Sequence, residues 1–407
     1  MGWPIPTLSP VATPRPPRLW RWFALLLLFV AIGGAAIVWL WPADRPASGM
    51  RFWLACLGLP LFSWLAMFSM RLLAYGNANA LATMQTEART HLLAQWREWG
   101  DQRLAVLQVE LLGPESRRYI SWNVVEAMFG DAAEPEPQPG NCRQMREVNP
   151  DDALSARQTA MLGWLLIEAG ESTKFVTEGG GAVEVVALGL TGSTTTDHAR
   201  EVADLLNTFS LDVVRAHAPE HAVEAKVSAL FGHWSTGAGK RCGLVAITQL
   251  WDETGDCHAS EGGVAIVLAP ESMARAANVK PVAWLRRPMQ SDMESLEHNL
   301  QTMLDAQGPP PPDAHWWLNG MDADSTCRLL SHSRVRQQAG PASAGAGNAT
   351  MLDMYIGPPG ALCEWQALAA ACIAARVQGT VQYFAARNQD GIVTARIDPF
   401  APNPESP

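Results

Sequence analysis

The sequence predicts an α/β protein in which an N-terminal transmembrane hairpin of two helices precedes a layered α/β soluble region. Two observations lead to this fold class. Two uncharged apolar runs, Phe23–Trp41 and Phe52–Met70, lie close together near the N-terminus. Beyond them, strand-like and helix-like apolar patterns alternate along most of the chain, which is typical of a layered α/β region.

Each apolar run is long enough to cross a bilayer. A helix of about 19 residues, at a rise of about 1.5 Å per residue, spans a hydrocarbon core of roughly 30 Å. We therefore expect transmembrane helices over residues 23–41 and 52–70, joined by a short periplasmic loop over 42–51. Tryptophans mark the ends of these runs, where amphipathic rings prefer to lie: Trp20, Trp22, Trp39, Trp41 and Trp53.

Basic residues predict the orientation, because Lys and Arg are retained on the cytoplasmic side of a membrane. Five arginines flank the hairpin on its outer sides and two lie in the connecting loop: Arg15, Arg18, Arg21, Arg71 and Arg89 against Arg45 and Arg51. The prediction is a multi-pass protein of the bacterial inner membrane, with residues 1–22 as a cytoplasmic tail and both termini and the main domain cytoplasmic. A cleaved signal peptide is the alternative for the first run, but that run exceeds the usual apolar region of about 7–15 residues, and a second span follows.

The overall composition limits the kinds of partner. Of the 407 residues, about 330 lie outside the hairpin, enough for one large or two ordinary domains. The formal net charge of −10 argues against nucleic acid as a partner, because nucleic-acid binders gather Lys and Arg on one face. The seven cysteines are odd in number and have no repeated spacing, which suits reduced cytosolic thiols.

A juxtamembrane amphipathic helix is expected over residues 71–103. Its apolar positions recur at steps of three and four, it closes at Gly100, and Asn77 or Asn79 is a candidate cap for its start. The helix could dock a partner or form a stalk on its own domain. The apolar positions are Leu81, Met84, Ala88, Leu92, Trp96 and Trp99.

The cytosolic α/β region is expected over residues 104–400, with an acidic, Pro-rich linker near 131–141 and a disordered tail over 401–407. The helix over 361–378 is rich in Ala and apolar around most of its circumference, so it should be buried at the centre of the fold. The predicted strands are 104–112, 183–190, 243–250, 264–268, 282–285 and a closing hairpin of 380–385 and 392–397. The other predicted helices are 121–129, 151–170 with a stop at Gly170, 196–209, 219–230 and 291–304, and the predicted loops are 309–312 and 339–347.

The sequence does not match common catalytic or metal-binding motifs. Gly237–Lys240 lacks the spacing of a phosphate-binding loop, and Ser193 and Ser235 lack the glycines of a hydrolase elbow. Cys257 and His258 form a close pair without the second pair that zinc needs, and Pro219 interrupts the His217/His221 spacing. The sequence predicts no metal and no cofactor.

The C-terminal third resembles a known fold. Glu261-Gly262-Gly263 runs into an apolar strand, and His315–Gly320, Tyr355-Ile356-Gly357 and Gly360-Ala361 follow before the Ala-rich helix and the closing hairpin. This order resembles the C-terminal half of the thiolase-like fold of ketoacyl synthases. In such enzymes a cysteine nucleophile sits at a helix start in the first half, and histidines, or a histidine and an asparagine, come from the second half. The first half here offers Cys142 and Cys242.

The whole architecture resembles a second family. A short tail, a membrane hairpin and one acidic α/β domain without a catalytic motif look like the adaptor proteins encoded near lipase effectors of bacterial type VI secretion systems. The resemblance implies a noncatalytic adaptor or chaperone, not an enzyme, that binds a secreted effector and the spike protein.

Two alternatives remain open. The first is a membrane-tethered, thiolase-like acyl-transfer enzyme with Cys242 or Cys257 as nucleophile and His315 or His332 as base. The second is a structural membrane protein in which the hairpin itself acts.

Overall fold

The computed structural model describes residues 2–4, 11, 13–42, 49–114, 142, 144–145, 153–178, 182–189, 213–217, 226–236, 241–251, 259–332 and 349–400. The chain forms two compact units. One consists of Ile5–Trp96, and the other combines Met1–Pro4 with Arg97–Pro407. The predicted helices 121–129 and 196–209, the linker 131–141, the loop 339–347 and the tail 401–407 lie outside the described residues.

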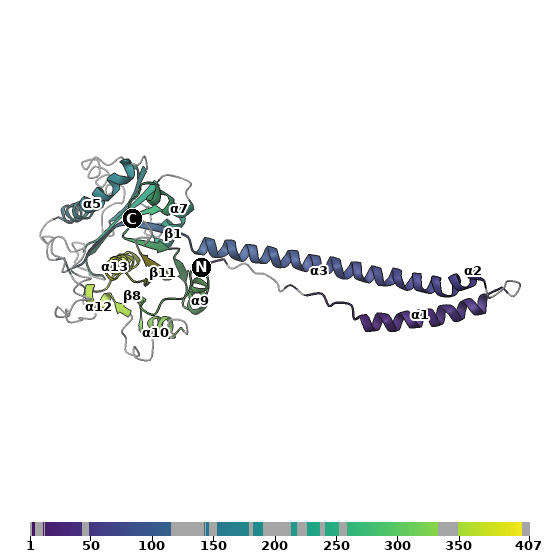
Figure 1. The fold of residues 1–407 in the computed structure, drawn as a ribbon. Helices are drawn as coiled ribbons and strands as arrows, with labels where there is room; N and C mark the ends of the chain where they lie inside the picture. Colours follow the sequence, from purple (N-terminus) through teal and green to yellow (C-terminus); the bar gives the residue numbers. More distant parts are fainter. Residues whose placement is uncertain are drawn as a thin grey trace. The chain divides into compact units, whose positions relative to one another are not determined.

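The N-terminal unit is an antiparallel helical hairpin (Figure 1). Helix α1 spans Leu19–Leu40; α2 (Met50–Trp53), the π-helical turn η1 (Leu54–Gly58) and α3 (Leu59–Gly100) form one continuous helix. The Trp64 indole donates to the Trp22 carbonyl at 2.9 Å, and Gly33 lies tightly against Pro60. Both helices are long and apolar enough to cross a membrane, which by itself is weak support for a membrane location.

The juxtamembrane segment is not a separate helix. A new start near Asn77 or Asn79 is wrong, because α3 runs without a break from Leu59 to Gly100. The predicted end at Gly100 is confirmed. Neither asparagine breaks the backbone, and the helix continues through Gly76 as well. The π-helical turn η1 ends two residues before Pro60, whose backbone nitrogen has no hydrogen to donate.

The domain is built on one 11-stranded sheet within the described residues. The strand order is β3-β2-β4-β5-β1-β6-β11-β10-β8-β9, and β7 pairs with β11. The strands are β1 (Arg103–Leu112), β2 (Ala182–Gly189), β3 (Val213–His217), β4 (Arg241–Gln249), β5 (Gly262–Pro270), β6 (Ala283–Arg286), β7 (Met289–Ser291), β8 (His315–Asn319), β9 (Ala349–Met351), β10 (Gln382–Asn388) and β11 (Gly391–Pro399).

The sheet consists of two halves with the same topology. In the first half β2 is parallel to β3 and β4, and β4 is antiparallel to β5, which pairs with β1. In the second half β8 is parallel to β9 and β10, and β10 is antiparallel to β11, which pairs with β6. The halves meet where β1 pairs with β6, so the domain is an internal duplication at the level of the fold.

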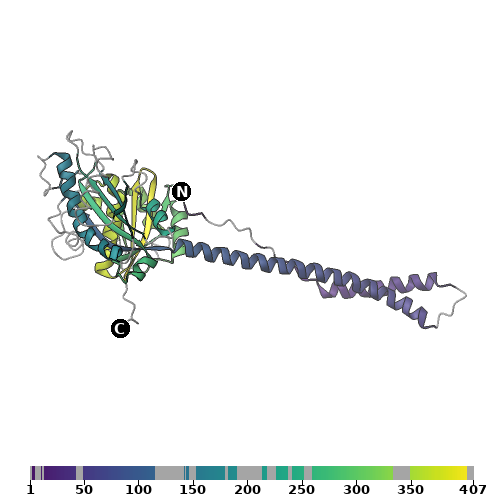
Figure 2. The ribbon, with the colours of Figure 1, turned by 90° about the horizontal axis from the view of Figure 1, so that it is seen from above.

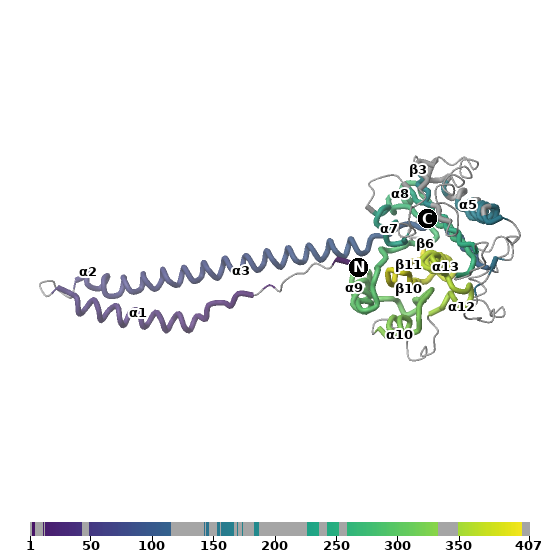
Figure 3. The backbone as a smooth tube through the Cα atoms, turned by 180° about the vertical axis from the view of Figure 1, so that it is seen from behind, coloured from purple at the N-terminus to yellow at the C-terminus, as the bar shows by residue number. Residues whose placement is uncertain are grey.

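Helices form layers on both faces of this sheet. Between the two halves lie α7 (Val227–Thr236) and α13 (Cys363–Gln378), which share one core with the inner faces of both halves (Figure 3). Helix α5 (Leu154–Glu178) covers the outer face of the first half (Figure 2). The remaining helical segments are α8 (Glu271–Ala276), α9 (Leu296–Gln307), α10 (Ala323–Ser331), α12 (Asp353–Ile356) and the 3-10 turn η4 (Gly360–Leu362).

Most predicted elements of the described region are confirmed. The predicted strands match β1, β2, β4, β5, β6 and the closing hairpin of β10 and β11, whereas β3, β7, β8 and β9 are not among the predicted strands. Helix α13 is buried almost throughout, as its composition predicts. The stop at Gly170 is wrong, because α5 continues to Glu178. Helix α9 begins at Leu296, later than predicted, since Ser291 ends β7 and a turn follows in which the Asp292 side chain accepts the Ser295 N–H. Helix α10 is not predicted from the sequence.

Candidate functional site

The starts of the two central helices meet in the middle of the domain. We call this point the helix-start junction and define it by Lys226, Val227, Glu364, Asn388 and Asp390. The Glu364 carboxylate accepts the Val227 backbone N–H at 3.1 Å, and therefore satisfies one of the unpaired donors at the start of α7. Asn388 also donates to Glu364, and Lys226 forms an ion pair with Asp390 in the β10–β11 turn.

The junction holds a buried carboxylate. Glu364 is 4% exposed, and burial raises its pKa above the ordinary value. The Val227 N–H, the Asn388 amide and the charge of Lys226 oppose this rise. The carboxylate is thus used as a helix cap and is enclosed by side chains of both halves.

A cysteine that the sequence did not single out lies beside this junction. Cys363 is the first residue of α13, and its thiol donates to the Asn319 carbonyl at 3.1 Å. The Asn319 side chain donates in turn to the Cys363 carbonyl at 3.0 Å. A helix start normally favours a thiolate, but burial and the neighbouring Glu364 raise the pKa of Cys363. The thiol is therefore held protonated.

The loop before α13 is closed against the first half. The Gln249 side chain accepts the Ala361 N–H at 3.0 Å and donates to the Ser260 carbonyl at 2.7 Å. Gly360 has a φ of 56°, and a Cβ there would lie 2.6 Å from the Gln249 side-chain oxygen. The loop thus needs glycine at this position, because both the backbone and the space exclude a side chain.

Cys242, one of the predicted nucleophiles, lies in β4 and belongs to the core cluster beneath α5. Its side chain therefore points to the opposite face of the sheet from α7 and α13. It is fully buried, and burial raises its pKa to about 12. Cys257 lies outside the described residues.

His315 is the first residue of β8 and lies at the opposite end of that strand from Asn319. At about 3.3 Å per residue the two backbones are roughly 13 Å apart. The His315 ring pairs with the Thr350 hydroxyl at 2.9 Å and tilts against Trp317, and burial lowers its pKa to about 4. His332 follows the end of α10. The structure does not bring Cys242, His315 and His332 together.

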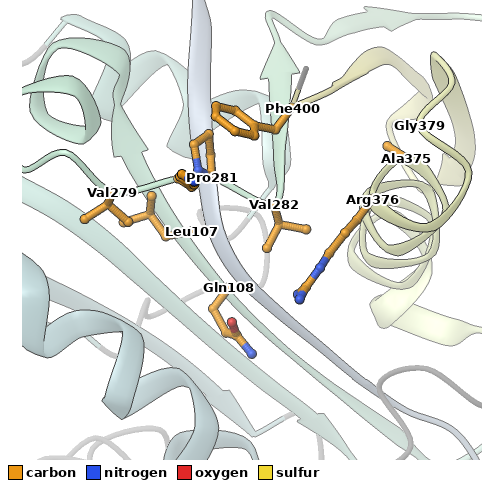
Figure 4. Close-up of a pocket in the computed structure, with 10 residues that line it drawn as sticks. Leu107, Gln108, Val279, Pro281, Val282, Ala375, Arg376, Gly379 and Phe400 are labelled. Atoms are coloured by element: carbon orange, nitrogen blue, oxygen red, sulfur yellow. The ribbon is translucent and has the colours of Figure 1, made fainter. Parts of the chain in front are cut away.

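A pocket of about 420 Å³ lies at the other end of α13 (Figure 4). Leu107 and Gln108 of β1, the segment before β6, the last turn of α13 and Phe400 line it, and Arg376 extends from α13 toward Gln108. Lys280 is a second basic residue in its lining. Of the α13 residues that line the pocket, Ala375 is nearest in sequence to Glu364, and at about 1.5 Å per residue it lies roughly 17 Å along the helix from the helix-start junction, so the two are separate.

The described residues contain no group of three His, Cys, Asp or Glu side chains that could hold a metal ion. The junction and the adjoining Cys363 offer a capped carboxylate, a protonated thiol and an asparagine. The Glu364 carboxylate joins the two halves through its hydrogen bond from Val227, and the set lacks an activated nucleophile with an adjacent base.

Comparison with known proteins identifies structures with a similar fold. No protein-family model and no curated protein sequence matches the chain. Among solved structures, the ketosynthase from module 1 of the bacillaene synthase of Bacillus amyloliquefaciens aligns with a TM-score of 0.52 at 12% identity, over 76% of this chain and 75% of that chain. The module 6 ketosynthase of the Bacillus subtilis bacillaene synthase gives 0.50 at 11% identity, over 74% of this chain and 72% of that chain.

A third structure is the AntDE:AntF complex, in which a type II PKS acyl-carrier protein is bound to its ketosynthase. It aligns with a TM-score of 0.50 at 11% identity, over 74% of this chain and 100% of that chain. At these identities the likeness concerns the fold alone. The domain has a thiolase-like fold, as the C-terminal third of the sequence indicates.

Proposed function

We propose that this protein is a noncatalytic adaptor of the bacterial inner membrane, whose thiolase-like domain binds a protein partner. The observation that carries the proposal is the state of the helix-start junction. Where the resembled enzymes place a cysteine at a helix start, Lys226 precedes α7 and Val227 begins it, and the sequence has no cysteine between Cys142 and Cys242. The space is taken by Glu364 and its partners.

The N-terminal unit supports the membrane location in this proposal. The two apolar helices and the tryptophans at their ends suit a transmembrane hairpin. The excess of arginine outside the connecting loop places both chain ends and the domain in the cytoplasm in this proposal. An adaptor held there would meet newly made effectors before their export.

The partner in this proposal is a lipase effector, delivered to the spike of a type VI secretion system. The architecture of tail, hairpin and acidic domain supports this choice through its resemblance to adaptors of that kind. In an adaptor the surface of a stable fold carries the function, so chemistry inherited with the fold is not required.

The fold likeness to ketosynthases keeps acyl transfer as a second candidate. Such an enzyme would need a thiolate, and burial raises the pKa of Cys242, Cys363 and Cys372. A base would also have to lie within hydrogen-bond reach of that thiolate. The placement of Cys242 and His315 described above weighs against this candidate.

The adaptor proposal is tested by secretion. The gene is deleted in the source bacterium, and the lipase effector in the culture supernatant is quantified by immunoblot, with cell-associated effector as the loading control. Loss of secreted lipase in the deletion strain, restored by the wild-type gene and equally by a Cys363→Ser variant, is expected. Unchanged lipase secretion in the deletion strain would refute the adaptor role. Restoration by wild type but not by Cys363→Ser, at equal protein level, would favour the enzyme.

A further inference from the structure

The segment Gly2–Pro4 belongs to the same compact unit as the domain, although the whole hairpin separates them in the sequence. Trp3 is the centre of this attachment. Its side chain is only 8% exposed, its indole N–H donates to the Pro288 carbonyl at 3.0 Å, and its ring meets the ring of Trp99 edge-on at 5.4 Å between centroids. Gly2 lies against Asn299 of α9, near the N label in Figure 3.

The site that receives Trp3 is closely fitted. We call it the Trp3 socket and define it by Trp99, Gly100, Pro288, Met289 and Ala306. A Cβ at Gly100 would lie 2.8 Å from the Trp3 ring and 3.0 Å from Ala306, so a larger residue there would displace the indole. The Trp3 backbone N–H also lies 3.3 Å from the Met289 sulfur.

Two further side chains, Arg287 and Gln307, hold the socket in shape. The Arg287 guanidinium lies over the Trp99 ring at 4.1 Å and donates to the Trp99 carbonyl at 3.0 Å. The Gln307 side chain donates to the Gly100 carbonyl at 3.0 Å and to the Arg287 carbonyl at 2.9 Å. The end of α3, the segment before β7 and α9 thus form one preorganised receptor for the N-terminal segment.

We propose that Trp3 is an intramolecular anchor that fixes the membrane topology of the chain. A folded domain occupies one side of a bilayer, so a segment docked in its core must lie on that side as well. The chain between Pro4 and Arg97 must then cross the membrane an even number of times. If it enters the membrane, α1 and the helix from Met50 cross as a pair.

The anchor has two consequences for the tether. The chain leaves the domain unit at Pro4 and at Arg97, and the contact between Trp3 and Trp99 makes these two points neighbours. The domain is therefore held by two adjacent segments instead of one. Removal of α1 by a signal peptidase would also remove Trp3, so a cleaved chain would carry an open socket. Neither consequence depends on the proposed adaptor role.

Disulfide trapping in membranes tests the docking. A Cβ at Gly2 would lie 2.8 Å from the Cγ atom of Asn299, so cysteines at these two positions would be close enough to form a disulfide. The full chain carrying Gly2→Cys and Asn299→Cys, with the exposed Cys327 replaced by Ser, is oxidised in isolated membranes with copper phenanthroline. Intramolecular crosslinks are read as a mobility shift on non-reducing gels.

The matched control moves the second cysteine two positions along α9. Gln301 lies on the opposite side of the helix from Asn299, so Gly2→Cys with Gln301→Cys should crosslink at least fivefold less. Adding Trp3→Ala to the reactive pair should lower the crosslinked fraction at least threefold, and Trp3→Phe should lower it less. Equal crosslinking at positions 299 and 301, or no effect of Trp3→Ala, would overturn the anchor.

Sidedness is read with a membrane-impermeant maleimide on intact spheroplasts. Thr13→Cys reports the tail, and the native, exposed Cys327 reports the domain. Both should be protected until the cells are lysed. Labelling of both in intact spheroplasts would leave the anchor standing and refute the cytoplasmic adaptor. Labelling of only one would refute the anchor.

Discussion

Glu364 is the buried residue that joins the two halves of the domain at the helix-start junction. A carboxylate with 4% exposure is costly unless it is hydrogen-bonded, and here the Val227 N–H and the Asn388 amide supply those bonds. Its function is to join the start of α7 to the start of α13.

The pH dependence of stability follows from this carboxylate. The folded-state pKa of Glu364 is raised above 4.5, so ionising this carboxylate costs free energy in the folded protein. The wild-type protein therefore loses stability as pH rises from the unfolded-state pKa through the folded-state pKa, and it does not pay this cost at lower pH. Glu364→Gln keeps the shape and cannot ionise. Its unfolding free energy, relative to wild type, should therefore increase from pH 4.5 to pH 8, by about 1.4 kcal/mol for each unit of pKa shift. Pulse proteolysis in urea measures it, and a constant difference would contradict the role.

Glu364→Ala provides the contrast. It leaves the Val227 N–H buried without its acceptor, which should lower the unfolding free energy by about 1–3 kcal/mol at pH 7. If the alanine variant matched the glutamine variant in stability, the hydrogen bond to Val227 would not contribute as described.

Thiol reactivity checks the cysteines individually. Raising the pKa of Cys242 from 9.0 to about 12 leaves about a thousandfold less thiolate at a given pH, and Cys363 is shifted in the same direction. Iodoacetamide at pH 7 should label the exposed Cys327 within minutes and leave both buried thiols unlabelled until the protein is denatured, as read by peptide mass spectrometry. Rapid labelling of Cys363 in the folded protein would reveal an activated nucleophile instead.

Site residues were the hardest part to predict from sequence, for a physical reason. Cys242 stands at the start of a strand whose residues are buried on both faces, so alternation of polarity could not reveal that its side chain points toward α5. Cys363 looked like one more small residue of an apolar helix. Its place opposite Asn319 depends on a contact 44 positions away, which no local pattern encodes.

At the scale of elements, α7 packs against β4 more closely than ordinary side chains allow. Gly243 lies directly beneath the Trp234 ring, and any side chain at residue 243 would overlap that ring. Helix α7 is enclosed between the two halves of the sheet and cannot move away. The glycine is therefore a packing requirement.

Gly243→Ala should lower the unfolding free energy by about 1–3 kcal/mol through overpacking. In a Trp234→Ala background the same substitution should cost less than 1 kcal/mol, because the overlapping ring is gone. Urea denaturation of the four proteins of this cycle gives the coupling energy. Additive effects would show that α7 relaxes freely, against the close packing inferred here.

Element boundaries show where sequence patterns succeed and fail. The Ala-rich helix and the closing hairpin were predicted well, because burial on all sides and a turn of Asn, Asp and Gly leave strong local signals. The sequence does not predict that α3 is continuous, because Asn77 and Asn79 resemble helix caps although the helix continues through both residues. Asparagine prefers a cap position, but this preference is small enough for asparagine to lie inside a long helix as well.

At the scale of the molecule, the domain is a duplicated unit with one helix from each half enclosed at its centre. Alternating strands and helices predicted the layered class, and the small residues before α13 indicated the thiolase-like fold. The pairing of β1 with β6 and the meeting of α7 with α13 join residues more than 100 positions apart. Those contacts form the candidate site, and the periodicity of apolar residues along the sequence cannot predict them.

The central claim is that the domain presents a binding surface and performs no acyl transfer. Native mass spectrometry of the full-length protein, purified in detergent from cells of the source organism, addresses both halves of this claim in one spectrum. The account predicts a complex with a defined protein partner, from which collisional activation releases the chain at its unmodified mass. A chain without a protein partner, carrying an acyl group on a cysteine, would contradict it.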